Sequence, residues 1–364
     1  MPGPATADSE ILRVCVIKDA EKLLLRVKGR YELYRLDKDV AAKEGKNLKN
    51  TEVIPVAGGL SIGGQEFGLR GVKIVPARSG AIYIDKRPFR GEVDIIKDAS
   101  GRLLAINHIA LGDYLKGVMR NEVSEWWPSE ALKAQAIAAR TYALYQKSIR
   151  GGRDYDVTSD IYSQVYGGRM SERWRTSKAI RHTRGQVLTY NGKILPAYYH
   201  ATCGGHTEDA AFLWNVDLPP MKGHRSNFCK VSPHYKWTCD ITVSEIERAL
   251  NRGRYKIKNL KYMIMQGRNA SGRLRSIKLV GDEEIEIPAG DFRLTLGPNL
   301  IKSTNFDIID KGNYLQFRGK GWGHGVGMCQ WGAYFLSKKR YRAEDILRFY
   351  YPGSEIRKIW AQPF

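Results

Sequence analysis

Residues 113–144 read DYLKGVMRNEVSEWWPSEALKAQAIAARTYAL, and this stretch decides the fold around a single carboxylate, Glu122. Before Glu122, apolar side chains recur at helical spacing, at Leu111, Tyr114, Leu115 and Val118. After it, the pair Pro128–Ser129 marks the start of a second helix. The pattern therefore predicts two helices with Glu122 in the short break between them.

The second predicted helix has a face that is almost all alanine, formed by Leu132, Ala136, Ala139 and Ala143. Because these side chains are short, a neighbouring element can pack very close to the helix, which makes it a rigid platform. Glu122 lies just before this helix, close in sequence to Trp126 and Trp127. Apolar surroundings would raise the pKa of Glu122 and keep it protonated as an acid. The alternative is an ordinary solvated glutamate at a helix end.

The chain has 364 residues, of which 43% are hydrophobic, and this length exceeds one compact core, so we expect two or three lobes. A net charge of +21 favours an anionic partner, which could be nucleic acid, anionic lipid or an acidic cell-wall polymer. The basic residues are spread from Arg13 to Arg357, and the sequence contains neither zinc-finger spacing nor an RNP-like aromatic run. We therefore expect no nucleic-acid partner.

The sequence also bears on membranes and export. It contains no run of roughly 18 apolar residues, so it predicts no transmembrane helix. The first residues, MPGPATADSE, lack the basic and then apolar pattern of a signal peptide. Either the protein is cytosolic, or its export segment lies outside this sequence.

The order of predicted elements favours a multi-lobed α+β fold in which strands dominate. Short strand segments fill residues 11–100, and the two helices follow. The dipeptide Asn191-Gly192 gives the strongest hairpin signal in the chain. We divide the chain into a β-rich N-terminal segment (1–84), a core in two parts (85–242 and 313–364) and a small inserted α+β lobe (243–312).

Four further segments combine polar, aromatic and glycine residues in a way that suits a ligand site. They are DVTSDIYSQVYGG (156–168), YHATCGGHTE (199–208), CKVSPHYKW (229–237) and GWGHGVGMCQWGA (321–333). The last lacks the Gly-Lys-Ser/Thr of a phosphate-binding loop, and its glycines instead allow tight bends and close approach of a ligand. His324 lies in its middle, where it could donate to a substrate or orient a carboxylate. The alternative is a satisfied core histidine.

Together with Glu122 and its two helices, the segments SQVYGG, HATCGGHTE, CKVSPHYKW and GWGHGVGMCQWGA resemble the stage II sporulation protein D (SpoIID) family. This family also includes amidase-enhancer-like proteins. The resemblance is ordered along the chain and covers about residues 85–355, including AEDILRFYYPG (343–353) near the end. Residues 11–80 match only loosely.

The resemblance implies a lytic transglycosylase that cuts peptidoglycan between N-acetylmuramic acid and N-acetylglucosamine and leaves a 1,6-anhydro end. The essential acid of the family carries over to Glu122, which would act as general acid and then as base. A water-using glycosidase needs two carboxyl groups, whereas here the C6 hydroxyl of the sugar attacks, so one suffices. We expect substrate contacts from Ser163, Gln164, Tyr166, His200, His324, Gln330, Arg140 and Tyr142.

The same resemblance implies the partners and the location. We expect the protein to bind glycan strands outside the cytoplasm, in the periplasm or cell envelope, alongside a peptidoglycan amidase. A membrane tether or an export signal would then lie outside this sequence. The rival interpretation is a non-catalytic wall-binding protein that stimulates an N-acetylmuramoyl-L-alanine amidase.

Metal binding is the remaining question. Some relatives carry a Cys and a His-Cys pair in the loop that matches Thr158 to Ser163, and bind zinc there. This chain has Thr158, Tyr162 and Ser163, which are not zinc ligands, so we expect no metal at that loop and no cofactor. For the cysteines three states stay open: zinc held by His200, Cys203, His206 and Cys229, a disulfide between Cys203 and Cys229, or free buried thiols.

Overall fold

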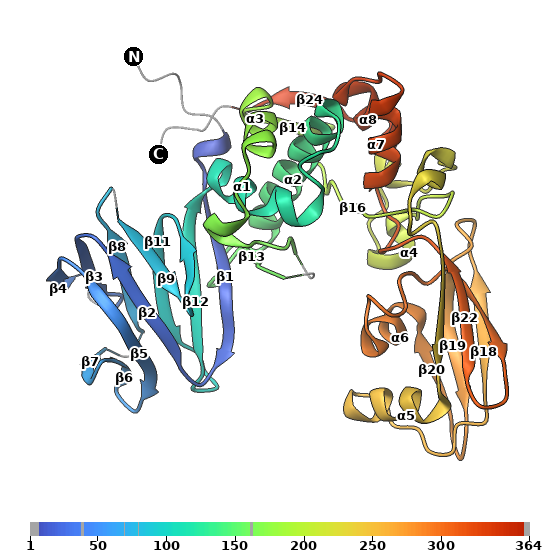
Figure 1. Ribbon diagram of the computed structural model, residues 1–364, viewed down its shortest axis with the longest axis horizontal. Coiled ribbons are helices and arrows are strands. Elements are labelled where there is room, and N and C mark those ends of the chain that lie inside the picture. The colour runs from blue at the N-terminus through green and yellow to red at the C-terminus, as the bar shows by residue number, and fades with distance from the viewer. Residues whose placement is uncertain (1–6, 38–39, 69, 79, 161–162, 360–364) are drawn as a thin grey trace. The chain divides into compact units, whose positions relative to one another are not determined.

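The structure is a computed structural model that describes residues 7–37, 40–68, 70–78, 80–160 and 163–359. The chain forms two compact units (Figure 1). The first is built from Met1–Trp127, Gln135–Pro196 and Ile356–Phe364, and the second from Pro128–Ala134 and Ala197–Glu355. Each unit is described below by itself.

The first unit contains two large sheets. One has seven strands in the order β13-β1-β12-β11-β8-β3-β4, and the other has six in the order β10-β9-β2-β5-β6-β7. The strands of the first sheet are β1 Ile11–Ala20, β3 Tyr31–Arg35, β4 Val40–Gly45, β8 Val72–Pro76, β11 Glu92–Lys97, β12 Leu103–Ala110 and β13 Val157–Thr158. Those of the second are β2 Leu23–Lys28, β5 Leu48–Val56, β6 Gly59–Ile62, β7 Gln65–Phe67, β9 Ala81–Ile84 and β10 Arg87–Phe89. In β2, side chains alternate between buried and outward-facing, as expected for a sheet with one face on the core.

The helices of the first unit follow directly from β12. Helix α1 spans Leu111–Glu122, and all four apolar positions that predicted it are completely buried. Helix α2 spans Ser129–Ile149, of which the part from Gln135 onward belongs to this unit, and α3 spans Trp174–His182. The 3-10 turns η1 Ala7–Ser9 and η2 Gly168–Ser171 pack against α1. The prediction of two helices separated by a short break is confirmed.

A small sheet completes the first unit, with strand order β15-β14-β24. Strands β14 (Gln186–Tyr190) and β15 (Lys193–Ile194) form the hairpin that Asn191-Gly192 predicted, because Tyr190 pairs with Lys193. Both turn residues have positive φ, 49° for Asn191 and 75° for Gly192, as a type I′ turn requires. Strand β24 (Glu355–Lys358) comes from the far end of the chain.

The second unit consists of three small sheets and five helices among the described residues. The sheets are β16 Tyr199–His200 with β23 Met328–Cys329; β17 Lys236–Ile241, β22 Leu315–Lys320 and β21 Phe306–Asp310; and β18 Tyr262–Arg268, β19 Leu274–Val280 and β20 Glu284–Pro288. The helices are α4 Ala210–Trp214, α5 Val243–Arg252, α6 Ala289–Leu296, α7 Gln330–Lys338 and α8 Ala343–Tyr350, with 3-10 turns η3 Pro219–Met221 and η4 Asn227–Val231. One apolar cluster joins α5 and α6 to two of the sheets around Phe292, Phe306 and Phe317.

The expected fold class is confirmed, since 28% of the residues are helical and 37% lie in strands of several separate sheets. The domain boundaries proposed at residues 84, 242 and 312 stay predictions. Within the described part of the chain, no helix is both long enough and apolar enough to cross a membrane.

Candidate functional site

Glu122 is the last residue of α1 rather than a residue of the break. Val123 follows it in an extended conformation, and the Val123 amide still donates to Met119 O. The Glu122 side chain is half-buried, and its Oε1 accepts a hydrogen bond of 3.3 Å from the amide of Val165. The carboxylate is therefore held by the segment 163–171, although it stays partly open to solvent.

Asn121, the neighbour of Glu122, anchors the end of α1 to the same segment. Its Nδ2 donates to Gly117 O at 3.1 Å and to Val165 O at 3.0 Å. Ser171 Oγ lies 3.2 Å from Asn121 Oδ1. The amide of Gly167 also donates to Gly117 O at 3.0 Å. These bonds fix the direction in which α1 presents Glu122.

Two tyrosines are electrostatic neighbours of Glu122. Burial raises the pKa of Tyr142 to about 12; Arg150 opposes this shift, and the negative charge of Glu122 adds to it. Tyr114 is completely buried, and its pKa lies well above the usual value, mainly through burial, with contributions from Tyr142 and Glu122. Both hydroxyls therefore keep their protons at neutral pH.

Gln164 and Tyr166 lie in the protein interior, which differs from the glycan contacts that we expected. Gln164 is 1% exposed; its Oε1 accepts from Tyr114 at 3.1 Å, and its Nε2 donates to Ala139 O at 3.2 Å. Tyr166 is 3% exposed and donates to Asn107 Oδ1 at 3.0 Å. The polar groups of both side chains are engaged within the protein, and both residues flank Val165, whose amide bonds to Glu122.

Arg140, which we also expected to contact the glycan, lies in the protein interior as well. Its side chain is completely buried, and its Nε donates to Asp8 Oδ1 at 2.5 Å. The remaining guanidinium nitrogens face backbone carbonyls, including Gln186 O at 3.2 Å and Ile180 O at 3.3 Å. A charge this deeply buried needs such partners. Arg140 therefore joins α2 to its neighbours instead of contacting a glycan.

In the described part of the loop at residues 156–168, hydroxyl groups lie where the sequence argument considered zinc ligands. Ser163 Oγ accepts from the amide of Thr158 at 3.1 Å, and the two hydroxyl oxygens also lie 3.1 Å apart. Thr158 Oγ1 further donates to Asp160. Hydroxyls bonded to one another do not resemble the thiolate and imidazole ligands of zinc. Tyr162, which entered the same sequence argument, lies outside the described residues.

An exposed aromatic and basic surface follows Glu122 in the first unit. Trp126 is 76% exposed, and the guanidinium of Arg175 lies 5.6 Å from its ring centre. Trp174 is 66% exposed, with Lys178 at 5.2 Å from its ring. Flat rings with adjacent cations can hold sugar rings that carry carboxylates. Trp174 is not among the site residues expected from the sequence, although its place at the start of a basic helix was a usable signal.

In the second unit, His324 is a neutral histidine within an aromatic group. Its Nδ1 accepts from the amide of Val326 at 3.1 Å, and its ring centre lies 4.9 Å from that of Trp214. Desolvation lowers the pKa of His324 to about 3, and the charges of Arg293 and Arg273 add to this effect. His324 therefore cannot serve as a cation near neutral pH. Gln330 begins α7 and is 5% exposed.

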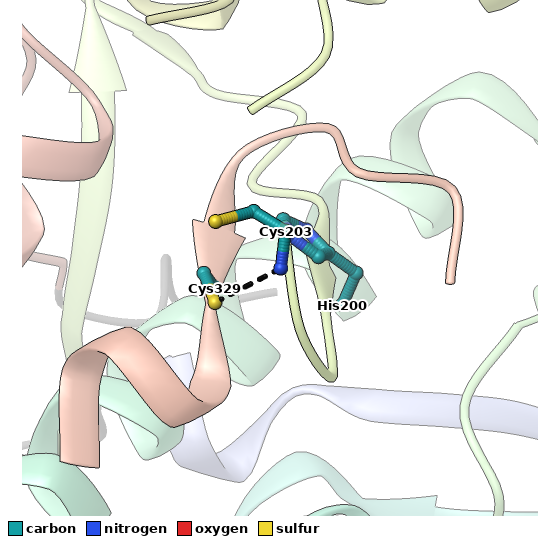
Figure 2. Close-up of side chains that lie close together, drawn as sticks. All are labelled: His200, Cys203 and Cys329. Carbon is teal, nitrogen blue, oxygen red and sulfur yellow. Dashed lines mark hydrogen bonds between the residues drawn. The ribbon is translucent and has the colours of Figure 1, made fainter. Parts of the chain in front are cut away.

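His200 and three cysteines lie close together in the second unit. Strands β16 and β23 pair in parallel with His200 opposite Cys329, and the ligand atoms of His200, Cys203 and Cys329 lie within 4.8 Å of one another (Figure 2). The sulfur of Cys229 lies 3.2 Å from that of Cys203, and all the cysteines are free thiols. The set of zinc ligands suggested by the sequence therefore changes in one member. His206 turns its Nδ1 to Thr207 O at 2.7 Å, and Cys329 joins the cluster instead.

The predicted site residues thus form two groups, one in each unit. Ser163, Gln164, Tyr166, Arg140 and Tyr142 belong to the unit of Glu122, whereas His200, His324 and Gln330 belong to the other. The convergence of His324 on Glu122 stays a prediction.

Comparison with known proteins gives two family matches. Residues 99–190 match the family described as "Stage II sporulation protein", and residues 222–327 match a "Domain of unknown function (DUF8618)". An uncharacterised protein of Brachyspira hyodysenteriae is 32% identical over 97% of this chain and 94% of its own length. The stage II sporulation protein D of Bacillus subtilis is 28% identical over 78% of this chain and 84% of its own length. The amidase enhancer of Bacillus subtilis is 27% identical over 66% of this chain and 40% of its own length.

Proposed function

The chain belongs to the stage II sporulation protein D family, and on that premise we propose that it is a peptidoglycan lytic transglycosylase. It would cut the bond between N-acetylmuramic acid and N-acetylglucosamine and leave a 1,6-anhydro end. The observation that carries the proposal is the setting of Glu122, a half-buried carboxyl group fixed at the end of a rigid helix. Because Glu122 ends α1, its carboxyl group lies at the negative end of the helix dipole.

The reaction needs only this one group. Glu122 donates its proton to the glycosidic oxygen while the bond from that oxygen to C1 of the muramic acid breaks. The C6 hydroxyl oxygen of the same sugar then bonds to C1, and its proton passes to the Glu122 carboxylate. This second transfer restores the acid, so each turnover starts from the same protonation state. No water enters the products, in contrast to ordinary glycoside hydrolysis.

The charge and the exposed rings favour a glycan substrate outside the cytoplasm. Muramic acid keeps a carboxylate when its peptide is removed, and the chain has a net charge of +21. Trp126 and Trp174, each beside a cation, supply flat apolar surface close in sequence to Glu122 and to η2. We propose glycan strands stripped of peptide as the substrate, with an amidase that removes the peptides as partner.

The decisive experiment uses Glu122→Gln, which keeps the size of the side chain and removes its acidity. Purified peptide-free glycan strands are incubated with the full chain, and products are measured by mass spectrometry. We expect the natural protein to release anhydro ends and Glu122→Gln to release at least roughly a hundredfold fewer. Glu52→Gln, a half-exposed carboxylate on β5, is the matched control and should keep full activity. Full activity of Glu122→Gln would refute the assignment.

A second candidate function is non-catalytic stimulation of an amidase, which the relative named amidase enhancer favours. The same variants distinguish it. A stimulator would release no anhydro ends itself, and Glu122→Gln would stimulate an added N-acetylmuramoyl-L-alanine amidase as well as the natural protein does.

A further inference from the structure

We infer that His200, Cys203, Cys229 and Cys329 form a buried four-coordinate zinc site in the second unit. This site is separate from the chemistry proposed for Glu122, and it differs from the set that the sequence suggested. Three thiols and one imidazole match the Cys₃His ligand sets of structural zinc sites.

The state of His200 is the first argument. His200 is 4% exposed, and its Nδ1 lies 3.0 Å from Val326 O. Because a carbonyl oxygen can only accept, Nδ1 must carry the proton, and Nε2 then presents a lone pair. Among the described residues, nothing hydrogen-bonds to this buried Nε2. A backbone carbonyl on one ring nitrogen and an unsatisfied lone pair on the other is the usual arrangement of a metal-binding histidine.

The environment of the sulfur atoms is the second argument. The amide of Cys203 lies 3.2 Å from Cys329 Sγ, and the amide of Gly205 lies 3.4 Å from Cys203 Sγ. Cys329 also caps α7, where its sulfur accepts from the amide of Gly332 at 3.4 Å. A neutral thiol is a weak acceptor, whereas a thiolate is a strong one. Three N–H groups aimed at two sulfurs, one of them at a helix N-terminus, therefore suit thiolates.

Charge balance is the third argument. Three thiolates around Zn²⁺ leave one net negative charge in the interior. Arg273 is 1% exposed and lies against this group, because its Nη2 donates to Cys203 O at 3.1 Å. Burial disfavours the charge of Arg273; the Glu208 carboxylate is the first of the negative charges that oppose this effect, and the three thiols follow. A buried guanidinium needs nearby negative charge, and the loaded site would add to that of Glu208.

The distances require only side-chain adjustment. Tetrahedral zinc with bonds of about 2.3 Å to sulfur places its ligand atoms about 3.5–3.8 Å apart. The sulfurs of Cys203 and Cys229 are now 3.2 Å apart, and the atoms of His200, Cys203 and Cys329 lie within 4.8 Å. With four protein ligands the site is closed, so the zinc would be structural. It would join β16, η4 and the start of α7, which lie far apart in the sequence.

A disulfide between Cys203 and Cys229 is the competing outcome. It would use two of the four ligands and would explain neither the lone pair of His200 nor the N–H groups that face Cys329. The sulfur of Cys229 lies 3.2 Å from that of Cys203, so one metal ion can reach both. A cation that binds all three sulfurs and His200 is the simpler explanation of the cluster.

The test is metal analysis of the full chain, purified with reductant and without chelator. We expect about one zinc per chain after extensive dialysis, and less than about a tenth of that in Cys329→Ser and His200→Gln. Cys239→Ser, a half-buried thiol of the same unit that lies outside the cluster, is the matched control and should keep its zinc. Loading the metal-free protein with Co²⁺ should produce the intense visible absorption of a tetrahedral thiolate site.

Two results would overturn the inference. One is a metal-free protein in which mass spectrometry of peptides finds Cys203 joined to Cys229. The other is full zinc content in Cys329→Ser. If the variants fail to fold, the cobalt spectrum of the natural protein decides, since a site without thiolates would give only weak absorption.

Discussion

Substitution of Gly117 tests the packing that holds Glu122 in place. Gly117 lies in the interior of α1, where alanine is normally preferred by about 1 kcal/mol. A Cβ at this position would lie 2.8 Å from Tyr166 Cδ2 and still closer to Cε2. Because carbon atoms pack at about 3.5–4.0 Å, the Tyr166 ring would have to retreat by about 1 Å.

The gain in helix propensity and the cost of overpacking have opposite signs, and we expect the cost of overpacking to be larger. Overpacking a buried site costs about 1–3 kcal/mol, and loss of the Tyr166 bond to Asn107 adds about 1 kcal/mol. After subtracting the gain in helix propensity, Gly117→Ala should destabilise the first unit by about 1–3 kcal/mol. Gly167 and Asn121 bond to Gly117 O, so Glu122 should also be displaced and activity should fall.

Hydrogen–deuterium exchange measured by mass spectrometry suits this prediction because it reports each unit separately. Amides of α1 should exchange roughly 5- to 150-fold faster in Gly117→Ala, since each 1.4 kcal/mol is a factor of ten. Gly290→Ala is the matched control: it lies in α6, where a Cβ meets nothing within 4 Å, and it should be neutral or slightly stabilising. If Gly117→Ala were as benign as Gly290→Ala, the close packing inferred here would be wrong.

Three further predictions concern Trp126, Arg140 and Cys15. Trp126→Ala should change stability by less than about 0.5 kcal/mol but weaken binding to purified glycan strands about tenfold, whereas Tyr341→Ala, also on the surface, should not affect binding. Arg140→Met should cost about 3–5 kcal/mol in urea denaturation and clearly less in an Asp8→Asn background, because Asp8 then no longer carries an unpaired charge. Burial raises the pKa of Cys15 to about 11, so alkylation of Cys15 in the folded protein should be slow at pH 8 and become faster only as the pH approaches 11. A denatured sample should react readily at pH 8–9. Peptide mass spectrometry measures both rates.

Local features of the fold could be predicted from the sequence because short-range geometry determines them. The apolar positions of α1 repeat with the period of a helix, and all of them are buried. Asn191-Gly192 adopts positive φ at both positions, which few other residues tolerate. Neither result depends on where distant parts of the chain lie.

The ligand cluster shows what local patterns could not provide. Closeness in sequence favours His206 as the partner of His200 and Cys203. The pairing of β16 with β23 instead places Cys329 opposite His200, across more than 120 residues. Spacing along the chain carries no information about such a register, so the sequence could identify the residue types but not the set.

The buried polar side chains of the first unit show a second limit, and it has a mechanistic consequence. Sequence reveals that Gln164, Tyr166 and Arg140 are polar, but not that the protein itself engages their polar groups. Because they are buried, they can act on a glycan only through the position of Glu122. Conservative changes among them should therefore lower kcat and leave glycan affinity almost unchanged, whereas changes at exposed Trp126 should do the reverse. If Gln164→Glu weakened glycan binding while kcat stayed intact, Gln164 would be a substrate contact after all, and the division between buried positioning residues and an exposed binding surface would fail.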